Sequence, residues 1–262
     1  MAEAVALNSD TIKAYWVPGC SSCLRMKEFL QNSGKSFEAV NIETRPDEAA
    51  ALRSFGLRPP AVVRDGRAIS GLDLVGVADL IGVDYAPPRI LPAAVLKQRY
   101  GAVTATACTL ISQLTPQQLQ YKAPDRDRTM AELGAHIGSI MRCFVDAYDN
   151  ERYDHSLENP AVEPTRPDEI VAIARETQRR LDDWWTRFGF DDPLDRVIET
   201  SWGPRTLLEA FERSVWHPMQ HTRQLTFFVE QHLGITPVRR LRPEDLAGLP
   251  LPEGIHAGDG DE

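Results

Sequence analysis

The sequence predicts two domains of different class, a compact α/β domain followed by an all-helical domain. Two observations predict this division. Residues 11–82 alternate between β-rich and helical segments, whereas nearly every segment after the proline-rich break at 83–92 has helical periodicity. A chain of 262 residues is long enough for two ordinary domains. We therefore expect an N-terminal domain at 1–84, a linker at 85–92, a helical domain at 93–234 and an acidic, partly disordered tail at 235–262.

The N-terminal domain is expected to have the order β-α-β-α-β-β-α. β-rich stretches predict strands over 11–17 and 36–42. The segment 61–70 predicts a hairpin, because its Asp65-Gly66 pair is typical of two-residue hairpin turns. The predicted helices, each with a glycine at or near its end, cover 23–34, 46–56 and 72–82.

The second domain is expected to be a four-helix bundle. Helical periodicity predicts four long helices, over 93–114, 129–148, 167–188 and 206–233. The pairs Thr129/Glu132 and Thr206/Glu209 have the spacing of capping boxes and fix two of the starts. Long helices with these connections predict an up-down bundle with one or two long crossings.

Composition excludes several classes of function. Apolar residues make up 42% of the chain and charged residues 26%, as in soluble globular proteins. The net charge of −9 argues against a nucleic-acid partner, since phosphate binding needs a basic face. No apolar run approaches the ~20 residues of a membrane span, and the N-terminus does not resemble a secretory signal. Four cysteines are too few for a disulfide framework, so we expect a reducing cytoplasm.

The stretch WHPMQHTRQL (216–225) places His217 and His221 four residues apart in the last predicted helix. Their rings then lie about 6 Å apart along the helix axis and about 40° apart around it, so both can reach one metal ion. Such pairs are also common on solvated helix faces, so a site needs a third ligand from another helix. His136 is mid-helix on an apolar strip that faces the bundle interior. Three imidazoles leave one position of a tetrahedral metal open, which is typical of a catalytic site.

These features resemble the DinB-like superfamily of thiol S-transferase-like metalloenzymes, over about 92–234. The family's last-helix pattern is close to H-x-x-x-H-x-G-Q followed by a hydrophobic residue. Here its positions are held by His217, His221, Gln224 and Leu225. Arg223 replaces the glycine, and Pro218 lies between the histidines, where it predicts a kink.

The resemblance implies metal ligands at His136, His217 and His221 and the use of a low-molecular-weight thiol such as glutathione, mycothiol or bacillithiol. The expected metal is zinc, although three neutral imidazoles also suit nickel, copper or iron.

A CxxC motif follows the first predicted strand, with Cys20 in a loop and Cys23 in the first turn of a helix. The start of a helix stabilises a thiolate, so we expect Cys20 to attack and Cys23 to resolve the mixed disulfide. Half of a zinc site is the alternative, but no second Cys or Cys/His pair lies nearby. Cys108 and Cys143 lie in apolar helical surroundings and are expected to act as small hydrophobes.

Residues 11–82 resemble glutaredoxins of the thioredoxin-like fold. The matching landmarks are the CxxC pair, Pro60 at the position of the family's cis-proline, and Gly71 and Asp73 where glutaredoxins contact glutathione. Arg58 and Pro59 replace the usual Thr-Val before that proline. The resemblance implies glutathione binding along Arg58, Pro59, Pro60, Gly71 and Asp73.

Together the two domains predict a metal- and thiol-dependent transferase, isomerase or lyase acting on a small electrophile, with the CxxC pair as its disulfide reductase. Two other functions stay open. One is a redox-regulated metal- or ligand-binding protein, and the other is a plain disulfide oxidoreductase whose bundle is a docking platform. The expected partners are a small thiol and a small electrophilic substrate, with neither nucleic acid nor membrane. A homodimer through the bundle is left open.

Overall fold

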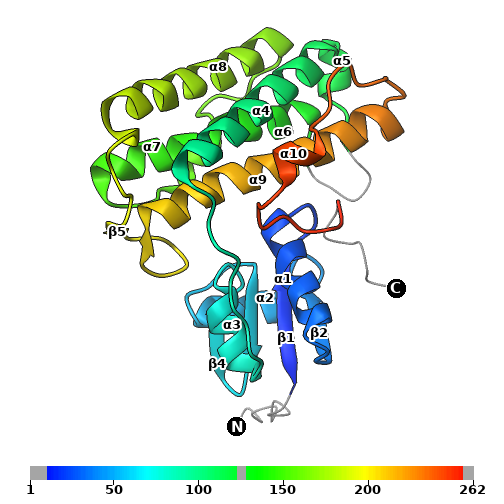
Figure 1. The fold of residues 1–262 in the computed structure, drawn as a ribbon. Coiled ribbons are helices and arrows are strands. Elements are labelled where there is room, and N and C mark those ends of the chain that lie inside the picture. Colours follow the sequence, from blue (N-terminus) through cyan, green and yellow to red (C-terminus); the bar gives the residue numbers. More distant parts are fainter. Residues whose placement is uncertain (1–10, 123–127, 256–262) are drawn as a thin grey trace. The chain divides into compact units, whose positions relative to one another are not determined.

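The computed structural model describes residues 11–122 and 128–255 of the chain. The chain divides into two compact units. One contains the N-terminal part up to Pro87 together with the segment that starts at Pro252, and the other is Pro88–Leu251. The N-terminal unit is a mixed sheet with helices and the second unit is helical, as the sequence predicts (Figure 1).

The N-terminal unit has a four-stranded sheet in the order β2-β1-β3-β4. β1 pairs in parallel with β2 and antiparallel with β3, and β3 pairs antiparallel with β4. The hairpin turns at Asp65 and Gly66, which have φ angles of 51° and 71°, the left-handed region that such a turn requires. The strands are Ile12–Trp16 (β1), Phe37–Asn41 (β2), Ala61–Arg64 (β3) and Arg67–Ser70 (β4).

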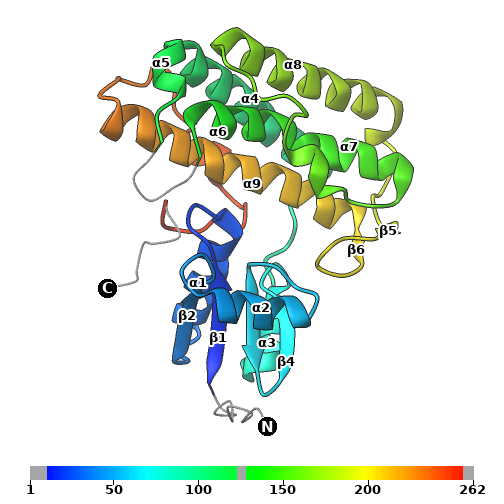
Figure 2. The same ribbon diagram turned by 180° about the vertical axis from the view of Figure 1, so that it is seen from behind.

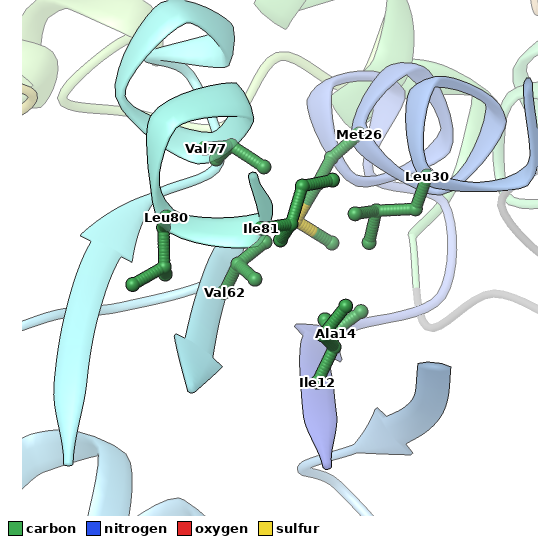
Figure 3. Close-up of a cluster of buried hydrophobic side chains, with 8 residues drawn as sticks. All are labelled: Ile12, Ala14, Met26, Leu30, Val62, Val77, Leu80 and Ile81. Carbon is green, nitrogen blue, oxygen red and sulfur yellow. The ribbon is translucent and has the colours of Figure 1, made fainter. Parts of the chain in front are cut away.

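Helices cover both faces of this sheet, because alternate residues of each strand point to opposite sides. α1 (Ser21–Asn32) and α3 (Leu74–Ile81) bury one apolar face, and α2 (Pro46–Ser54) covers the other. Figure 3 shows the first cluster, which contains Ile12, Ala14, Met26, Leu30, Val62, Val77, Leu80 and Ile81. This cluster fixes α1, and with it the CxxC motif, on the sheet.

The second unit is a bundle built on α4 (Ala93–Ser112), α6 (Met130–Ser139), α7 (Met141–Asn150), α8 (Pro167–Trp184) and α9 (Leu207–Phe227). α4 and α6 each pack against both α8 and α9 (Figure 2). The smaller elements are α5 (Pro116–Leu119), η1 (His155–Glu158), η2 (Trp185–Gly189), η3 (Phe228–His232), α10 (Pro243–Leu246) and the hairpin β5–β6 (Val197–Ile198, Arg205–Thr206).

The helix expected over 129–148 is two successive helices, α6 and α7, joined at Ile140. Ile140 keeps helical backbone angles, but its carbonyl accepts from the amide of Cys143 only three residues on. At the end of α6, Gly138 lies against α8, where a side-chain carbon would come within 3.1 Å of the backbone of Ala174. A glycine at this position lets the two helices approach closely.

α9 continues through Pro218 as one helix, although the proline lacks the amide that the helix would use there (Figure 1). The hydroxyl of Thr222 donates to the carbonyl of Pro218 at 2.8 Å. α9 therefore carries His217 and His221 on successive turns of an unbroken helix.

Residues 235–255, expected to belong to a partly disordered tail, make specific contacts. Gln113, the C-cap of α4, donates to the carbonyl of Thr236 and accepts from the amide of Val238, at 2.9 and 3.0 Å. Within the N-terminal unit, Glu28 accepts from the amides of Glu253 and Gly254. The rest of the predicted tail, 256–262, lies outside the described residues. Among the helices that the structure describes, none has the length and hydropathy needed to cross a membrane.

Candidate thiol and metal sites

The two CxxC cysteines lie at the start of α1 and are joined by a disulfide, with their Cα atoms 5.2 Å apart. Cys20 is the residue that caps the helix, and its sulfur accepts from the amide of Cys23 at 3.1 Å. Cys20 is half-buried, whereas Cys23 is fully buried. The arrangement presents Cys20 as the sulfur that an external thiol reaches first.

Two of the predicted thiol-contact residues meet beside α1. The Pro59–Pro60 peptide bond is cis, as the resemblance implies, and the carbonyl of Pro60 accepts from the amide of Gly71 at 2.8 Å. A side-chain carbon on Gly71 would lie 2.4 Å from the sulfur of Met26, so only glycine fits there.

The other predicted thiol-contact residues, Arg58, Pro59 and Asp73, differ in their surroundings. Asp73 is the N-cap of α3, where its carboxylate accepts from the amide of Gly76. Pro59 is half-buried and Arg58 is exposed. The binding of glutathione by these residues remains a prediction.

The three histidines predicted as metal ligands come together inside the bundle. His136 comes from α6, and His217 and His221 come from α9. One ring nitrogen from each can be chosen so that all three lie within 4.8 Å of one another. The side chains are buried, with exposed fractions of 3%, 7% and 2%.

The rings of His136 and His221 are each oriented by a hydrogen bond between Nδ1 and an oxygen acceptor. Nδ1 of His136 lies 3.0 Å from the backbone carbonyl of Glu158 and 3.1 Å from Oδ1 of Asn159. Nδ1 of His221 lies 2.7 Å from Oε1 of Gln224. A carbonyl only accepts, so Nδ1 carries the hydrogen and Nε2 of both rings keeps its lone pair for a cation.

The surroundings favour the neutral form of His136 and His217, because they lower the pKa of both side chains. Burial and the positive charge of Arg128 lower the pKa of His136 to about 3. Burial and the charge of Arg213 lower the pKa of His217 well below its usual value. Neutral imidazole is the form that binds metal, so low pKa values favour occupation at neutral pH.

His217 has an arrangement that a bound cation would complete. Its Nε2 lies 3.0 Å from Nε2 of His221, which keeps a lone pair, so Nε2 of His217 carries the hydrogen between them. Its buried Nδ1 has no hydrogen-bond partner among the described residues and lies 4.0 Å from a carboxylate oxygen of Glu158. If the ring hydrogen of His217 were on Nδ1 instead, it would point toward this carboxylate. Nε2 of His217 would then have a free lone pair, as Nε2 of His136 and His221 do. The residues therefore fit a divalent metal.

Glu158 supports the site, and sequence reasoning missed it. Burial disfavours its ionised form, but the Arg213 guanidinium at 3.0 Å and the hydrogen bond from His155 lower its pKa to about 2. Arg213 also donates to the hydroxyl of Tyr153 at 3.1 Å. Glu158 lies in the polar loop 150–167, whose sequence has no periodicity that would place it against a helix. Only its carboxylate, in the loop that follows the predicted helix of His136, was a signal.

The two remaining cysteines are separate from the thiol site. Cys143 is fully buried, and burial raises its pKa to about 12. Cys108 is half-buried, and burial raises its pKa as well. Both thiols stay protonated at neutral pH, as expected of small hydrophobes.

Comparison with known families separates the same two regions. The model of the DinB superfamily matches residues 99–225, which include all three histidines. The glutaredoxin model matches residues 12–69, which include the CxxC pair and Arg58 to Pro60 but end before Gly71 and Asp73. No curated protein matches the chain.

Proposed function

Because the chain joins a glutaredoxin domain to a metal-binding helical domain of the DinB superfamily, we propose that it is a metal- and thiol-dependent enzyme acting on a small electrophile. The observation that carries the proposal is the convergence of three buried imidazoles in a chain that also has a disulfide-linked CxxC pair. The reaction class is a transfer, isomerisation or elimination that uses a low-molecular-weight thiol such as glutathione.

In the bundle, His136, His217 and His221 would hold the metal, with zinc as the first candidate and nickel or iron as the others. When bound, the metal would supply a Lewis acid that stabilises a thiolate near neutral pH. Glu158 and Gln224 fix which ring nitrogens face the centre. Burial of the three rings excludes water from the side of the site that they line.

In the glutaredoxin domain, Cys20 would reduce disulfides formed between the small thiol and a product or second thiol. The Cys20 thiolate attacks one sulfur, the disulfide bond breaks and the other sulfur leaves as a thiolate. Cys23 then attacks Cys20, releases the second thiol and forms the Cys20–Cys23 disulfide found in the structure. Two further molecules of thiol reduce this disulfide by exchange and leave as their own disulfide, which returns Cys20 and Cys23 to the thiol form.

The test measures both activities in one preparation. Metal content is measured by elemental analysis, thiol transfer with glutathione and 1-chloro-2,4-dinitrobenzene, and disulfide reduction with hydroxyethyl disulfide. The proposal expects a bound divalent metal, transfer that is lost with the metal, and reduction that survives its removal. A metal-binding protein without thiol-dependent turnover on any electrophile tested would instead be a redox-regulated binding protein, and would overturn the proposal.

A further inference from the structure

A second group of reactive side chains lies where the loop after α7 runs beside the segment before β6. The amide of Glu199 donates to the carbonyl of Glu151 at 2.9 Å, and the amide of Tyr153 donates to the carbonyl of Glu199 at 2.8 Å. These two backbone hydrogen bonds form a parallel bridge between residues 152 and 199. They fix the loop that starts η1 next to the turn that follows β5.

His155 in this loop makes one hydrogen bond with each of its ring nitrogens. Nδ1 lies 3.0 Å from Oε1 of Glu158, and Nε2 lies 2.9 Å from the hydroxyl oxygen of Ser201. A carboxylate only accepts, so Nδ1 carries the hydrogen and Nε2 accepts from the serine hydroxyl. Ser201, His155 and Glu158 are thus connected as the nucleophile, base and acid of a Ser-His-acid triad are.

The serine is held at the apex of a fixed turn. The hydroxyl of Thr200 accepts from the amide of Trp202 at 3.2 Å and donates to the carbonyl of Gly203 at 2.6 Å. Gly203 has a φ of 99°, which favours glycine. Ser201 is exposed, and its amide has no acceptor in the part of the chain that the structure describes. Its hydroxyl is therefore accessible, and its amide can donate to an oxyanion.

The histidine ring is held by aromatic neighbours. Its centroid lies 5.0 Å from the ring of Tyr153 and 5.5 Å from that of Trp202. The guanidinium of Arg213 lies over both aromatic rings, at 5.3 and 5.1 Å. The same Arg213 makes an ion pair with the carboxylate of Glu158 at 3.0 Å. The base therefore has a fixed ring and a charged partner.

We propose that Ser201, His155 and Glu158 form a second catalytic site, which hydrolyses small activated esters or thioesters through an acyl-serine intermediate. This activity goes beyond the metal- and thiol-dependent function proposed above, and its site shares Glu158 with the metal site. The hydroxyl of Ser201 attacks the acyl carbon while its proton moves to Nε2 of His155, and the bond to the leaving oxygen or sulfur breaks. His155 protonates the leaving group. Water, deprotonated by the same nitrogen, then attacks the acyl-serine and releases the carboxylic acid and the free serine.

The reaction is tested with 4-nitrophenyl acetate as substrate and a fluorophosphonate as a covalent probe, on the full chain. We expect a burst of 4-nitrophenolate and a single probe adduct, located by peptide mass spectrometry on Ser201. Ser201→Ala should abolish both. His155→Asn should slow acylation by about 100-fold or more, the usual contribution of a general base.

Matched controls separate this site from the rest of the chain. Ser156→Ala removes another exposed serine, the residue that follows His155 in η1, and should leave burst and labelling unchanged. No contact joins Ser201 to His136, His217 or His221 within the described residues, so the metal content of Ser201→Ala should equal that of the unchanged chain. Glu158 is not substituted, because its carboxylate also pairs with Arg213 and lies 4.0 Å from Nδ1 of His217. An equal burst in Ser201→Ala and the unchanged chain, or an adduct elsewhere than Ser201, would overturn the proposal.

Discussion

The thiol site and the histidine site are built in opposite ways. Cys20 and Cys23 lie three positions apart at the start of one helix, and the local backbone alone presents them. The rings of the histidine site come from α6 and α9. The acceptors that orient these rings come from a loop and from α9. A site made by one segment depends on that segment, whereas a site made by several depends on the packing of all of them.

The largest effect is expected from removing one histidine. In His221→Ala, the affinity for zinc should fall by more than about 100-fold, the upper end of what loss of an outer partner costs. Disulfide reduction by the CxxC pair should not change. Zinc titration in competition with a chelator measures the first quantity and hydroxyethyl disulfide reduction the second. His232→Ala is the control, since His232 pairs with Tyr121 and is not among the three converging rings.

Cys20→Ser should produce the reverse pattern. The variant cannot form the Cys20–Cys23 disulfide, so disulfide reduction should be lost. Zinc affinity should equal that of the unchanged chain. A fall in both quantities would mean that the cysteine pair, rather than the three histidines, holds the metal.

A smaller loss of zinc affinity is expected when all three histidines are kept and a hydrogen-bond acceptor of one of them is removed. Gln224→Leu leaves Nδ1 of His221 without its partner at 2.7 Å, so zinc affinity should fall by about 10- to 100-fold. Thr222→Val is the matched control, because Thr222 is also buried on α9 but its hydroxyl donates to the carbonyl of Pro218 and not to a histidine. Equal losses in the two variants would assign the effect to helix packing instead of ring orientation.

The smallest effect tests whether the two units are independent. Thr206 caps α9, since its hydroxyl accepts from the amide of Glu209 and its amide donates to the Glu209 carboxylate. Thr206→Ala should reduce the free energy of unfolding of the bundle by about 1 kcal/mol. Calorimetry should show only one of two transitions at a lower temperature. A shift of both by the same amount would show that the units unfold together.

The elements that the sequence predicts depend on near neighbours in the chain. The hairpin at Asp65-Gly66 and the capping boxes at Thr129 and Thr206 were predicted from residues at most three positions apart, and the structure contains all of them. The convergence of His136 with the α9 histidines was predicted from helical phase, because a helix fixes which residues share a face.

The features that were not predicted depend on loop geometry. Glu158 reaches His136 from a loop, and His155 reaches Ser201 where segments about 45 residues apart are joined by backbone hydrogen bonds at Glu199. Loops have no period that gives the direction of a side chain. The change from α6 to α7 at Ile140 escaped prediction for a similar reason, because it accompanies close packing against α8 and not a helix-breaking residue.

The central claim is that the bundle holds a metal through three imidazoles, and X-ray absorption at the zinc edge of the zinc-loaded chain tests it most directly. We predict a first shell of three histidine nitrogens at about 2.0–2.1 Å and one further oxygen or nitrogen. His136→Ala should remove one imidazole from that shell. A shell containing two sulfurs at about 2.3 Å, or one that His136→Ala leaves unchanged, would contradict the claim.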